Sequence, residues 1–211
     1  MKIIDNILKV ESLIANKCLV IFDLDDTLYS EKEYLKSGYK KVAELVPMIL
    51  DAEKQLWRFF EEKKDAIDQL LLLNGIYSDQ LKEKCICAYR SQKPDISLYE
   101  GVREMLKRIR LEGKRIAIVT DGRPEGQRAK LKALDVECLV DKIIITDELG
   151  GIAFRKPNPL AFEILKDEFQ TEYSSMVYIG DNLKKDPLAC DVLGIDFIYF
   201  HNNESIYYNH S

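Results

Sequence analysis

The pattern of hydrophobic and polar positions divides the chain into two kinds of sequence. Residues 17–22 and the segment after residue 94 contain short β-branched apolar runs separated by amphipathic stretches, whereas residues 30–94 show helical spacing alone. Helices that alternate with short apolar strands are typical of a parallel sheet covered on both faces. The pattern therefore predicts a three-layer α/β domain, residues 1–29 and 95–211, with a helical insertion at residues 30–94.

The elements of the α/β part follow from the period of each segment. Strands are predicted at residues 17–22, 115–120, 142–146, 176–180 and 196–200, and helices at residues 2–16, 99–112, 124–134, 159–169 and 185–193. The first of these helices is predicted from apolar residues at helical spacing between Ile3 and Leu13. The tail after His201 is polar and is expected to be loose.

Composition and charge narrow the possible functions. The 211 residues are 46% hydrophobic and 32% charged, as in a globular protein, and the formal net charge is −5. This balance gives no basic surface for a nucleic acid or an anionic membrane. No apolar run is long enough to span a bilayer, and the N-terminus does not resemble a signal peptide. We therefore expect a cytoplasmic protein without nucleic-acid or membrane partners.

Cysteine and histidine offer little for a metal or catalytic site. The five cysteines lack a zinc or redox spacing and are interpreted as reduced, mostly buried thiols: Cys18, Cys85, Cys87, Cys138 and Cys190. His201 and His210 both lie near the C-terminus, which disfavours a histidine-based triad. The chemistry of this chain is therefore expected to depend on carboxylates, lysine and threonine.

Three carboxylates follow the first predicted strand within four positions. In an extended segment side chains alternate, so Asp23 and Asp25 are expected to converge while Asp26 faces elsewhere. Open α/β sheets bind ligands beyond the carboxyl ends of their strands, and two carboxylates there suit Mg²⁺. The alternative is that these aspartates cap the next helix or form a turn.

Further strand ends carry polar residues that suit phosphate or metal. Thr120 and Asp121 end one strand at the start of a helix, where a hydroxyl and loop amides can bind phosphate oxygens. Lys156 lies in a loop that prolines stiffen. Asp181 ends another strand, and Asp186 lies about one helical turn farther on, so both can supply carboxylates for a metal.

These residues, in this order, resemble the signature of the haloacid dehalogenase-like superfamily of phosphatases and phosphotransferases. The signature is Asp-x-Asp-x-Thr, then Ser or Thr, then Lys, then Gly-Asp-x-x-x-x-Asp. The matching residues are Asp23, Asp25, Thr27, Thr120, Lys156, Gly180, Asp181 and Asp186. The resemblance covers about residues 17–200 and implies a Rossmann-like core, with residues 30–94 as a small helical cap over the substrate.

The resemblance also implies the catalytic and phosphate-binding roles. Asp23 would be the nucleophile that forms an aspartyl-phosphate. Asp25 would be the general acid and base, which protonates the leaving alkoxide and then activates water. Thr120, Asp121 and Lys156 would bind the phosphoryl group. Asp121 departs from the asparagine that many relatives have, and it adds a negative charge that must be compensated.

The metal ligands are implied in the same way. Mg²⁺ would be held by Asp23, by the main-chain carbonyl of Asp25 and by Asp181. Asn182 and Asp186 would support this site, although Asn182 replaces a carboxylate that some members have.

The residues also bear on which of the family's reactions is expected. Dehalogenases lack an acid at the position of Asp25, because halide leaves without a proton, so phosphate ester hydrolysis is favoured. Thr27 resembles the phosphatase form of the first motif more than the mutase form. A phosphomutase, or a non-catalytic protein that binds a phosphorylated metabolite, remains the alternative.

The expected substrate is a small phosphomonoester, such as a sugar, polyol or amino-alcohol phosphate or a nucleotide. Tyr29 and Arg123 are candidate substrate contacts. Aromatic and basic residues of the insertion are candidates too, although packing explains them equally well: Tyr34, Tyr39, Trp57 and Arg58. The sequence does not identify the leaving group or the oligomeric state.

Overall fold

The computed structural model describes residues 1–206, so His210 lies outside the described residues. The chain forms two compact units. The first, which we call the core unit, contains residues 1–31 and 97–211, and the second, the helical unit, contains residues 32–96. Each unit is described by itself below.

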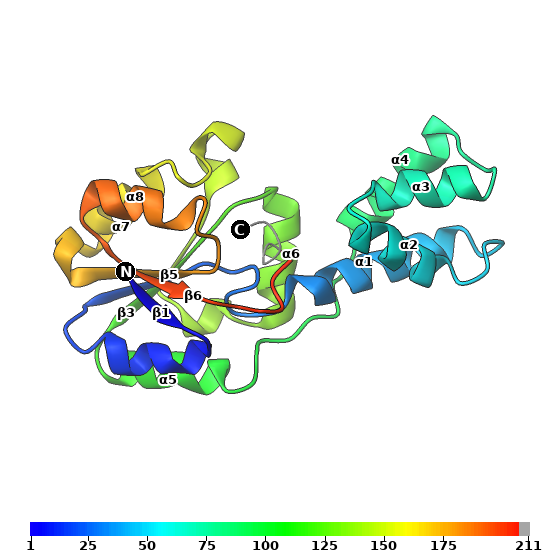
Figure 1. The fold of residues 1–211 in the computed structure, drawn as a ribbon. Coiled ribbons are helices and arrows are strands. Elements are labelled where there is room, and N and C mark those ends of the chain that lie inside the picture. Colours follow the sequence, from blue (N-terminus) through cyan, green and yellow to red (C-terminus); the bar gives the residue numbers. More distant parts are fainter. Residues whose placement is uncertain (207–211) are drawn as a thin grey trace. The chain divides into compact units, whose positions relative to one another are not determined.

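The core unit is built around a six-stranded sheet in which every neighbouring pair is parallel (Figure 1). The strand order is β1-β6-β5-β2-β3-β4. The strands are β1 (Lys2–Ile4), β2 (Leu19–Phe22), β3 (Arg115–Thr120), β4 (Lys142–Ile145), β5 (Met176–Gly180) and β6 (Asp196–Phe200). In the register of the central strands, Phe22 of β2 lies opposite Ile179 of β5 and Ile118 of β3. The predicted α/β class with a parallel sheet is confirmed.

Helices bury both faces of this sheet. The helices are α5 (Val102–Leu111), α6 (Pro124–Leu134), α7 (Leu160–Phe169) and α8 (Asp186–Leu193). Helices α7 and α8 pack over alternate residues of β2, such as Leu19 and Ile21, in one apolar cluster. All four residues of β2 are buried, as expected for an interior parallel strand. The centre of the sheet is therefore a rigid base for the residues that follow its strands.

The N-terminal segment differs from the prediction. Residues 2–16 do not form one amphipathic helix; they form strand β1 and a 3-10 helix, Ile7–Leu13. Asn6 caps the 3-10 helix by accepting the N–H of Leu8 at 2.9 Å, and β1 pairs with β6 at the edge of the sheet. The helical prediction was wrong because Asp5 and Asn6 favour a break in the chain at this point.

The helical unit contains helices only, as the apolar spacing predicts. The helices are α1 (Glu31–Leu45), α2 (Ala52–Glu61), α3 (Ala66–Leu73) and α4 (Asp79–Arg90). The first residue of α1 belongs to the core unit and the remainder to the helical unit. An apolar cluster that includes Val42, Leu56 and Leu70 forms the interior of the helical unit.

The cysteines are free, but the expectation that most are buried was wrong. Cys85 and Cys190 are buried, whereas Cys18, Cys87 and Cys138 are exposed. The exposed ones lie before the first residue of β2, within helix α4 and in a 3-10 turn, outside the apolar clusters.

Among the described residues, no helix combines the length and apolar character that crossing a bilayer requires.

Candidate active site

The carboxyl ends of three neighbouring strands bring the sequence-predicted residues together. Asp23 directly follows β2, and its N–H donates to the carbonyl of Ile179 at 2.8 Å, which extends the pairing with β5. Thr120 is the last residue of β3, and Asp181 directly follows β5. Because β2 lies between β3 and β5 and all three are parallel, these ends meet at one edge of the sheet.

Three buried carboxylates, those of Asp23, Asp181 and Asp186, form what we call the acid cluster. One oxygen of each lies within 4.8 Å of the other two. Asp186 is the first residue of α8, and its Oδ2 accepts the N–H of Asn182 at 3.0 Å. A Cβ on Gly180 would collide with this same oxygen. Glycine is therefore needed at the end of β5 so that the Asp186 carboxylate can approach the strand closely.

The ammonium group of Lys156 pairs with two carboxylates of the acid cluster. Its Nζ lies 2.8 Å from Asp23 Oδ1 and 3.1 Å from Asp186 Oδ1, and it donates to the hydroxyl oxygen of Tyr178 at 2.5 Å. Only 1% of the Lys156 side chain is exposed. Burial alone would lower the pKa of Lys156, but the carboxylates of Asp186 and Asp23 outweigh burial and raise it. Lys156 is therefore held as a cation.

Two carboxylates fix the loop that carries Lys156. Arg155 donates two hydrogen bonds to Asp147, at 2.7 and 2.8 Å, in the forked geometry that favours this pair. Asp121 Oδ1 accepts the N–H of Lys156 at 3.0 Å and the hydroxyl of Thr146 at 2.9 Å. These bonds hold residue 155 and the N–H of Lys156, and they thereby fix the backbone position from which the lysine side chain extends.

The acid cluster has an excess of negative charge. Burial first, and then repulsion from Asp186, raises the pKa of Asp23 to about 6 although Lys156 opposes the shift. Burial and repulsion from Asp23 and Asp186 raise the pKa of Asp181 to about 8. Three carboxylates with a single ammonium are unfavourable in a buried site. An excess of two negative charges on oxygen ligands fits a divalent cation such as Mg²⁺.

Asp25 lies outside the acid cluster, in contrast to the expectation that its carboxylate converges with that of Asp23. Strand β2 ends at Phe22, so the alternation of side chains does not continue to Asp25. Asp25 Oδ1 accepts a hydrogen bond from Lys130 Nζ at 2.6 Å and another from the Tyr29 hydroxyl, and Oδ2 accepts one from Gln127 Nε2 at 2.8 Å. Burial raises the pKa of Asp25, but Lys130 and these donors lower it below its usual value.

The negative charge of Asp121 is compensated by lysine. Asp121 Oδ2 lies 3.0 Å from Lys185 Nζ. Burial opposes ionisation, but Lys156 and Lys185 outweigh it and lower the pKa of Asp121. Protein donors thus engage both carboxylate oxygens, and Asp121 positions the Lys156 loop. The hydroxyl oxygen of Thr120, at the end of the same strand, accepts a hydrogen bond from Gln127 Nε2 at 2.5 Å.

The remaining predicted site residues are Tyr29, Arg123 and Asn182, of which Tyr29 contacts Asp25 directly. Tyr29 is fully buried and its hydroxyl is used by Asp25. Arg123 is exposed, directly before α6. The side chain of Asn182 accepts the N–H of Lys184 at 3.0 Å, so Asn182 supports the acid cluster only through its backbone bond to Asp186.

The candidate residues of the helical unit are mainly packing residues within that unit. Tyr34 and Tyr39 are buried, and their rings lie 5.8 and 5.9 Å from the ring of Tyr89. Trp57 is half-buried and Arg58 is exposed.

The polar tail after β6 is docked on the core unit as far as residue 206, which corrects the expectation of a loose segment for residues 202–206. Residues 207–211 of this tail lie outside the described residues. Asn202 donates to the carbonyl of Asp26 at 2.8 Å, and the N–H of Ile206 donates to Asp26 Oδ2 at 2.9 Å. Ser205 donates to Asp181 Oδ2 at 2.7 Å and thus orients a member of the acid cluster. Asp26 does not join the acid cluster, as predicted, and instead anchors this tail.

Sequence reasoning missed several residues that contact the site: Gln127, Lys130, Tyr178, Lys185 and Ser205. The sequence contains a signal for three of these residues, Gln127, Lys130 and Tyr178. Gln127 and Lys130 are polar residues three positions apart on a helix, where a shared face can be buried. Tyr178 is a hydroxyl within an apolar strand, and a buried tyrosine hydroxyl usually has a hydrogen-bond partner. Ser205 carries no such signal, because its role depends on the path of an irregular tail.

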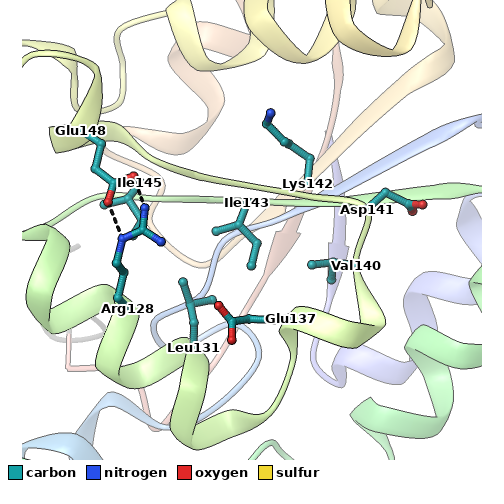
Figure 2. Close-up of a pocket in the computed structure, with 9 residues that line it drawn as sticks. All are labelled: Arg128, Leu131, Glu137, Val140, Asp141, Lys142, Ile143, Ile145 and Glu148. Carbon is teal, nitrogen blue, oxygen red and sulfur yellow. Dashed lines mark hydrogen bonds and ion pairs between the residues drawn. The ribbon is translucent and has the colours of Figure 1, made fainter.

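A surface cavity of about 220 Å³ lies apart from the acid cluster. Figure 2 shows its lining, which comes from α6, the edge strand β4 and the segments that flank β4. Two of the lining residues, Arg128 and Glu148, form an ion pair with a shortest distance of 2.7 Å. No residue that binds or belongs to the acid cluster lines this cavity.

Comparison with known proteins identifies related sequences. A family model described as "Haloacid dehalogenase-like hydrolase" matches residues 20–200. The chain is 26% identical to a glyceraldehyde 3-phosphate phosphatase of Pyrococcus abyssi, over 86% of this chain and 80% of that protein. It is 28% identical to a phosphoglycolate phosphatase of Vibrio vulnificus, over 87% of this chain and 85% of that protein.

Solved structures share the fold. A haloacid dehalogenase-superfamily hydrolase of Geobacter sulfurreducens has a TM-score of 0.67 at 16% identity, covering 89% of each chain. A putative hydrolase of the same kind from Bacillus subtilis, solved bound to magnesium, has a TM-score of 0.65 at 21% identity, covering 87% of this chain and 86% of that one.

Proposed function

Because the chain belongs to the haloacid dehalogenase-like hydrolases, we propose that it is a phosphatase that hydrolyses a small phosphomonoester through a phosphorylated Asp23. The observation that carries this proposal is the buried Asp23 carboxylate, 2.8 Å from Lys156 Nζ, within a cluster that has excess negative charge. The names of the relatives from Pyrococcus abyssi and Vibrio vulnificus, both phosphatases of small metabolites, support the substrate class.

The proposed reaction has two displacements. In the first, a carboxylate oxygen of Asp23 bonds to phosphorus and the bond from phosphorus to the ester oxygen breaks. Asp25, whose lowered pKa keeps it ionised in the free protein, takes up a proton from solvent beforehand and gives it to the leaving alkoxide. In the second, Asp25 takes a proton from water, whose oxygen bonds to phosphorus while the bond to Asp23 breaks. Inorganic phosphate leaves and Asp23 is regenerated. Lys156 and the Thr120 hydroxyl stabilise the negative charge of the phosphoryl oxygens.

A divalent metal fits the donor set described above. We propose that Asp23, Asp181 and the main-chain carbonyl of Asp25 hold Mg²⁺, with Asp186 in support. The ion would supply the positive charge that lets an anionic carboxylate approach an anionic phosphate. The protein's own residues prepare this site: Ser205 orients Asp181, and the Asn182 backbone orients Asp186.

We assign leaving-group recognition to the helical unit, which would act as the cap that excludes water during the first transfer. A small cap fits sugar, polyol or amino-alcohol phosphates and nucleotides.

The five free cysteines are in line with the reducing compartment that the sequence predicts.

The test is phosphate release from a panel of small phosphomonoesters, with Asp23→Asn as the critical variant. We expect magnesium-dependent multiple turnover by the wild type and a loss of roughly 10⁴-fold or more in Asp23→Asn, because the amide is not nucleophilic. Asp191→Asn, an identical change at an exposed position of α8, is the matched control and should keep wild-type activity. Multiple turnover by Asp23→Asn would contradict the covalent mechanism. A phosphoryl group that moves within the substrate without release of phosphate would instead indicate a mutase.

A further inference from the structure

Helix α6 buries two polar side chains on the face that it turns toward the site. Gln127 and Lys130 are 3% and 5% exposed, close to the 1% and 2% of the neighbouring apolar residues Leu131 and Leu134. Residues three apart in a helix lie on the same face. Lysine is seldom buried unless it is paired, because removing its charge from water is costly. Both buried side chains therefore need hydrogen-bond or ion-pair partners, and both have them among the residues at the strand ends.

Both residues contact the carboxylate of Asp25. Lys130 Nζ lies 2.6 Å from Asp25 Oδ1. Gln127 Nε2 lies 2.8 Å from Asp25 Oδ2 and 2.5 Å from Thr120 Oγ1. The side-chain amide of Gln127 thus joins the end of β3 to the segment after β2, and the side chain of Lys130 is only 6% exposed.

These donors leave a defined position on Asp25 for a further hydrogen. An ionised carboxylate has about four lone-pair sites. Among the hydrogen bonds of the described residues, Lys130 and Tyr29 use Oδ1 and Gln127 uses Oδ2. The remaining capacity is on Oδ2, the oxygen held by the amide that also contacts Thr120.

We propose that Gln127 and Lys130 are positioning residues that fix the Asp25 carboxylate so that Oδ2 exchanges the proton with the leaving oxygen and with water. This inference rests on the proposed function and deepens it. Neither residue touches the phosphate in this assignment. Gln127 holds the side chains of Asp25 and Thr120 at a fixed position relative to each other. Lys130 stabilises the ionised Asp25 carboxylate that forms when the proton is given away.

The competing explanation is a structural ion pair with no effect on proton transfer. The two explanations differ in how the loss depends on the leaving group. An alkoxide needs a proton as it leaves, whereas p-nitrophenolate leaves without one. Misplacing Asp25 should therefore slow the first transfer, which kcat/KM reports, selectively for alkyl phosphates. Partial loss of structure should lower kcat/KM equally for both substrates.

The experiment compares kcat and KM for p-nitrophenyl phosphate and for the alkyl phosphate that the wild type hydrolyses fastest in the panel. Gln127→Met removes the amide without a change of charge and keeps a similar volume. Lys130→Met removes the ammonium, and Lys130→Arg restores a cation. Lys132→Met, at an exposed position of the same helix, is the matched control.

We expect Gln127→Met and Lys130→Met to lower kcat/KM, which reports the first transfer, roughly 100-fold for the alkyl phosphate and less than about tenfold for p-nitrophenyl phosphate. Lys130→Arg should recover part of the loss. In an Asp25→Asn background, the loss caused by Gln127→Met should disappear, because no proton-transferring carboxyl remains to be positioned.

Equal losses of kcat/KM on both substrates, or losses that persist in the Asp25→Asn background, would overturn the positioning role and leave the phosphatase proposal intact. A wild type that hydrolyses no alkyl phosphate would overturn the proposed function and this inference with it. If Lys130→Met does not fold, Gln127→Met decides the matter alone.

Discussion

The two units of the chain bury different kinds of side chain. Among the described residues, nearly all buried polar and charged side chains belong to the core unit, and Gln92 is the exception in the helical unit. The interior of the helical unit is an apolar cluster of residues such as Val42, Leu56 and Leu70. In the core unit, an apolar sheet ends in a group of buried carboxylates and lysines.

This difference separates stability from chemistry. Burial of apolar side chains stabilises the folded state at any pH, because these side chains carry no titratable group. Buried carboxylates with too few cations destabilise the folded state unless a ligand or metal compensates their charge. The core unit thus has unfavourable electrostatics at the strand ends, where we propose that a cation and phosphate bind. The predictions below test whether the two units differ in this way.

The largest effect should follow from Asp25→Asn in the core unit. The amide cannot give or take a proton, so we expect turnover to fall roughly 10³-fold while Asp23 is still phosphorylated slowly. The phosphorylated form should accumulate, because its hydrolysis also needs the base. Intact-protein mass spectrometry after mixing with substrate should detect one added phosphoryl group, and peptide mapping should assign it to Asp23.

Asp68→Asn makes the same change in the helical unit, where Asp68 pairs with Lys82 at 2.6 Å on a partly exposed surface. This control should turn over normally and accumulate no adduct. An adduct on a residue other than Asp23, or unchanged turnover in Asp25→Asn, would remove the distinction between the units.

The sequence was informative about the core unit because its chemistry lies at strand ends. Asp23, Thr120 and Asp181 each follow or end a short apolar run, so their convergence follows from parallel pairing alone. The loop lysine, Lys156, was recognised from its place in the motif order. The geometry that holds it was not predictable, because Asp121 lies far from Lys156 in the chain and the pairing of Arg155 with Asp147 depends on the fold of an irregular loop.

The failures have physical causes as well. Helical periodicity misled at residues 2–16, where pairing with β6 outweighs local propensity. The direction of the Asp25 carboxylate could not be read from alternation, because the strand ends at Phe22 and tertiary donors on α6 determine it. Ser205 was missed because no period describes an irregular tail.

A smaller effect should appear in the stability of the metal-free core unit as pH changes. The pKa of Asp181 is raised from 3.8 to about 8 and that of Asp23 from 3.8 to about 6. At a pH between the ordinary value of 3.8 and these raised values, the two carboxyl groups are protonated in the folded protein and ionised in the unfolded chain. The free energy of unfolding must therefore fall as pH rises from about 4 to about 8. Urea unfolding followed by circular dichroism in EDTA should show this loss, and Mg²⁺ should reverse it.

Asp181→Asn provides the matched variant. The amide oxygen can still accept the hydroxyl of Ser205, but the side chain no longer ionises. In EDTA at pH 8 we expect this variant to be more stable than the wild type by of order 2 kcal/mol, with a flatter pH dependence and no stabilisation by Mg²⁺. A wild type whose stability rises between pH 5 and pH 8 in EDTA would contradict the assigned charge excess.

The smallest effect should come from Ile49→Val in the helical unit. Ile49 is 6% exposed within the apolar cluster, so loss of one methylene should lower the free energy of unfolding by about 0.5–1.5 kcal/mol. Trp57 is the single tryptophan of the chain and belongs to the helical unit, so its fluorescence reports the unfolding of that unit.

Ile144→Val is the matched change in the core unit, where Ile144 is 5% exposed in the apolar cluster beside the sheet. Both variants should lose a similar amount of stability, because both sites are apolar. The loss from Ile49→Val, followed by Trp57 fluorescence, should be the same at pH 5 and pH 8 and with or without Mg²⁺, since no buried carboxylate cluster lies in the helical unit as described. If Mg²⁺ or pH changed that loss, the stability of the helical unit would depend on the charge state of the strand ends, and apolar packing alone would not account for it.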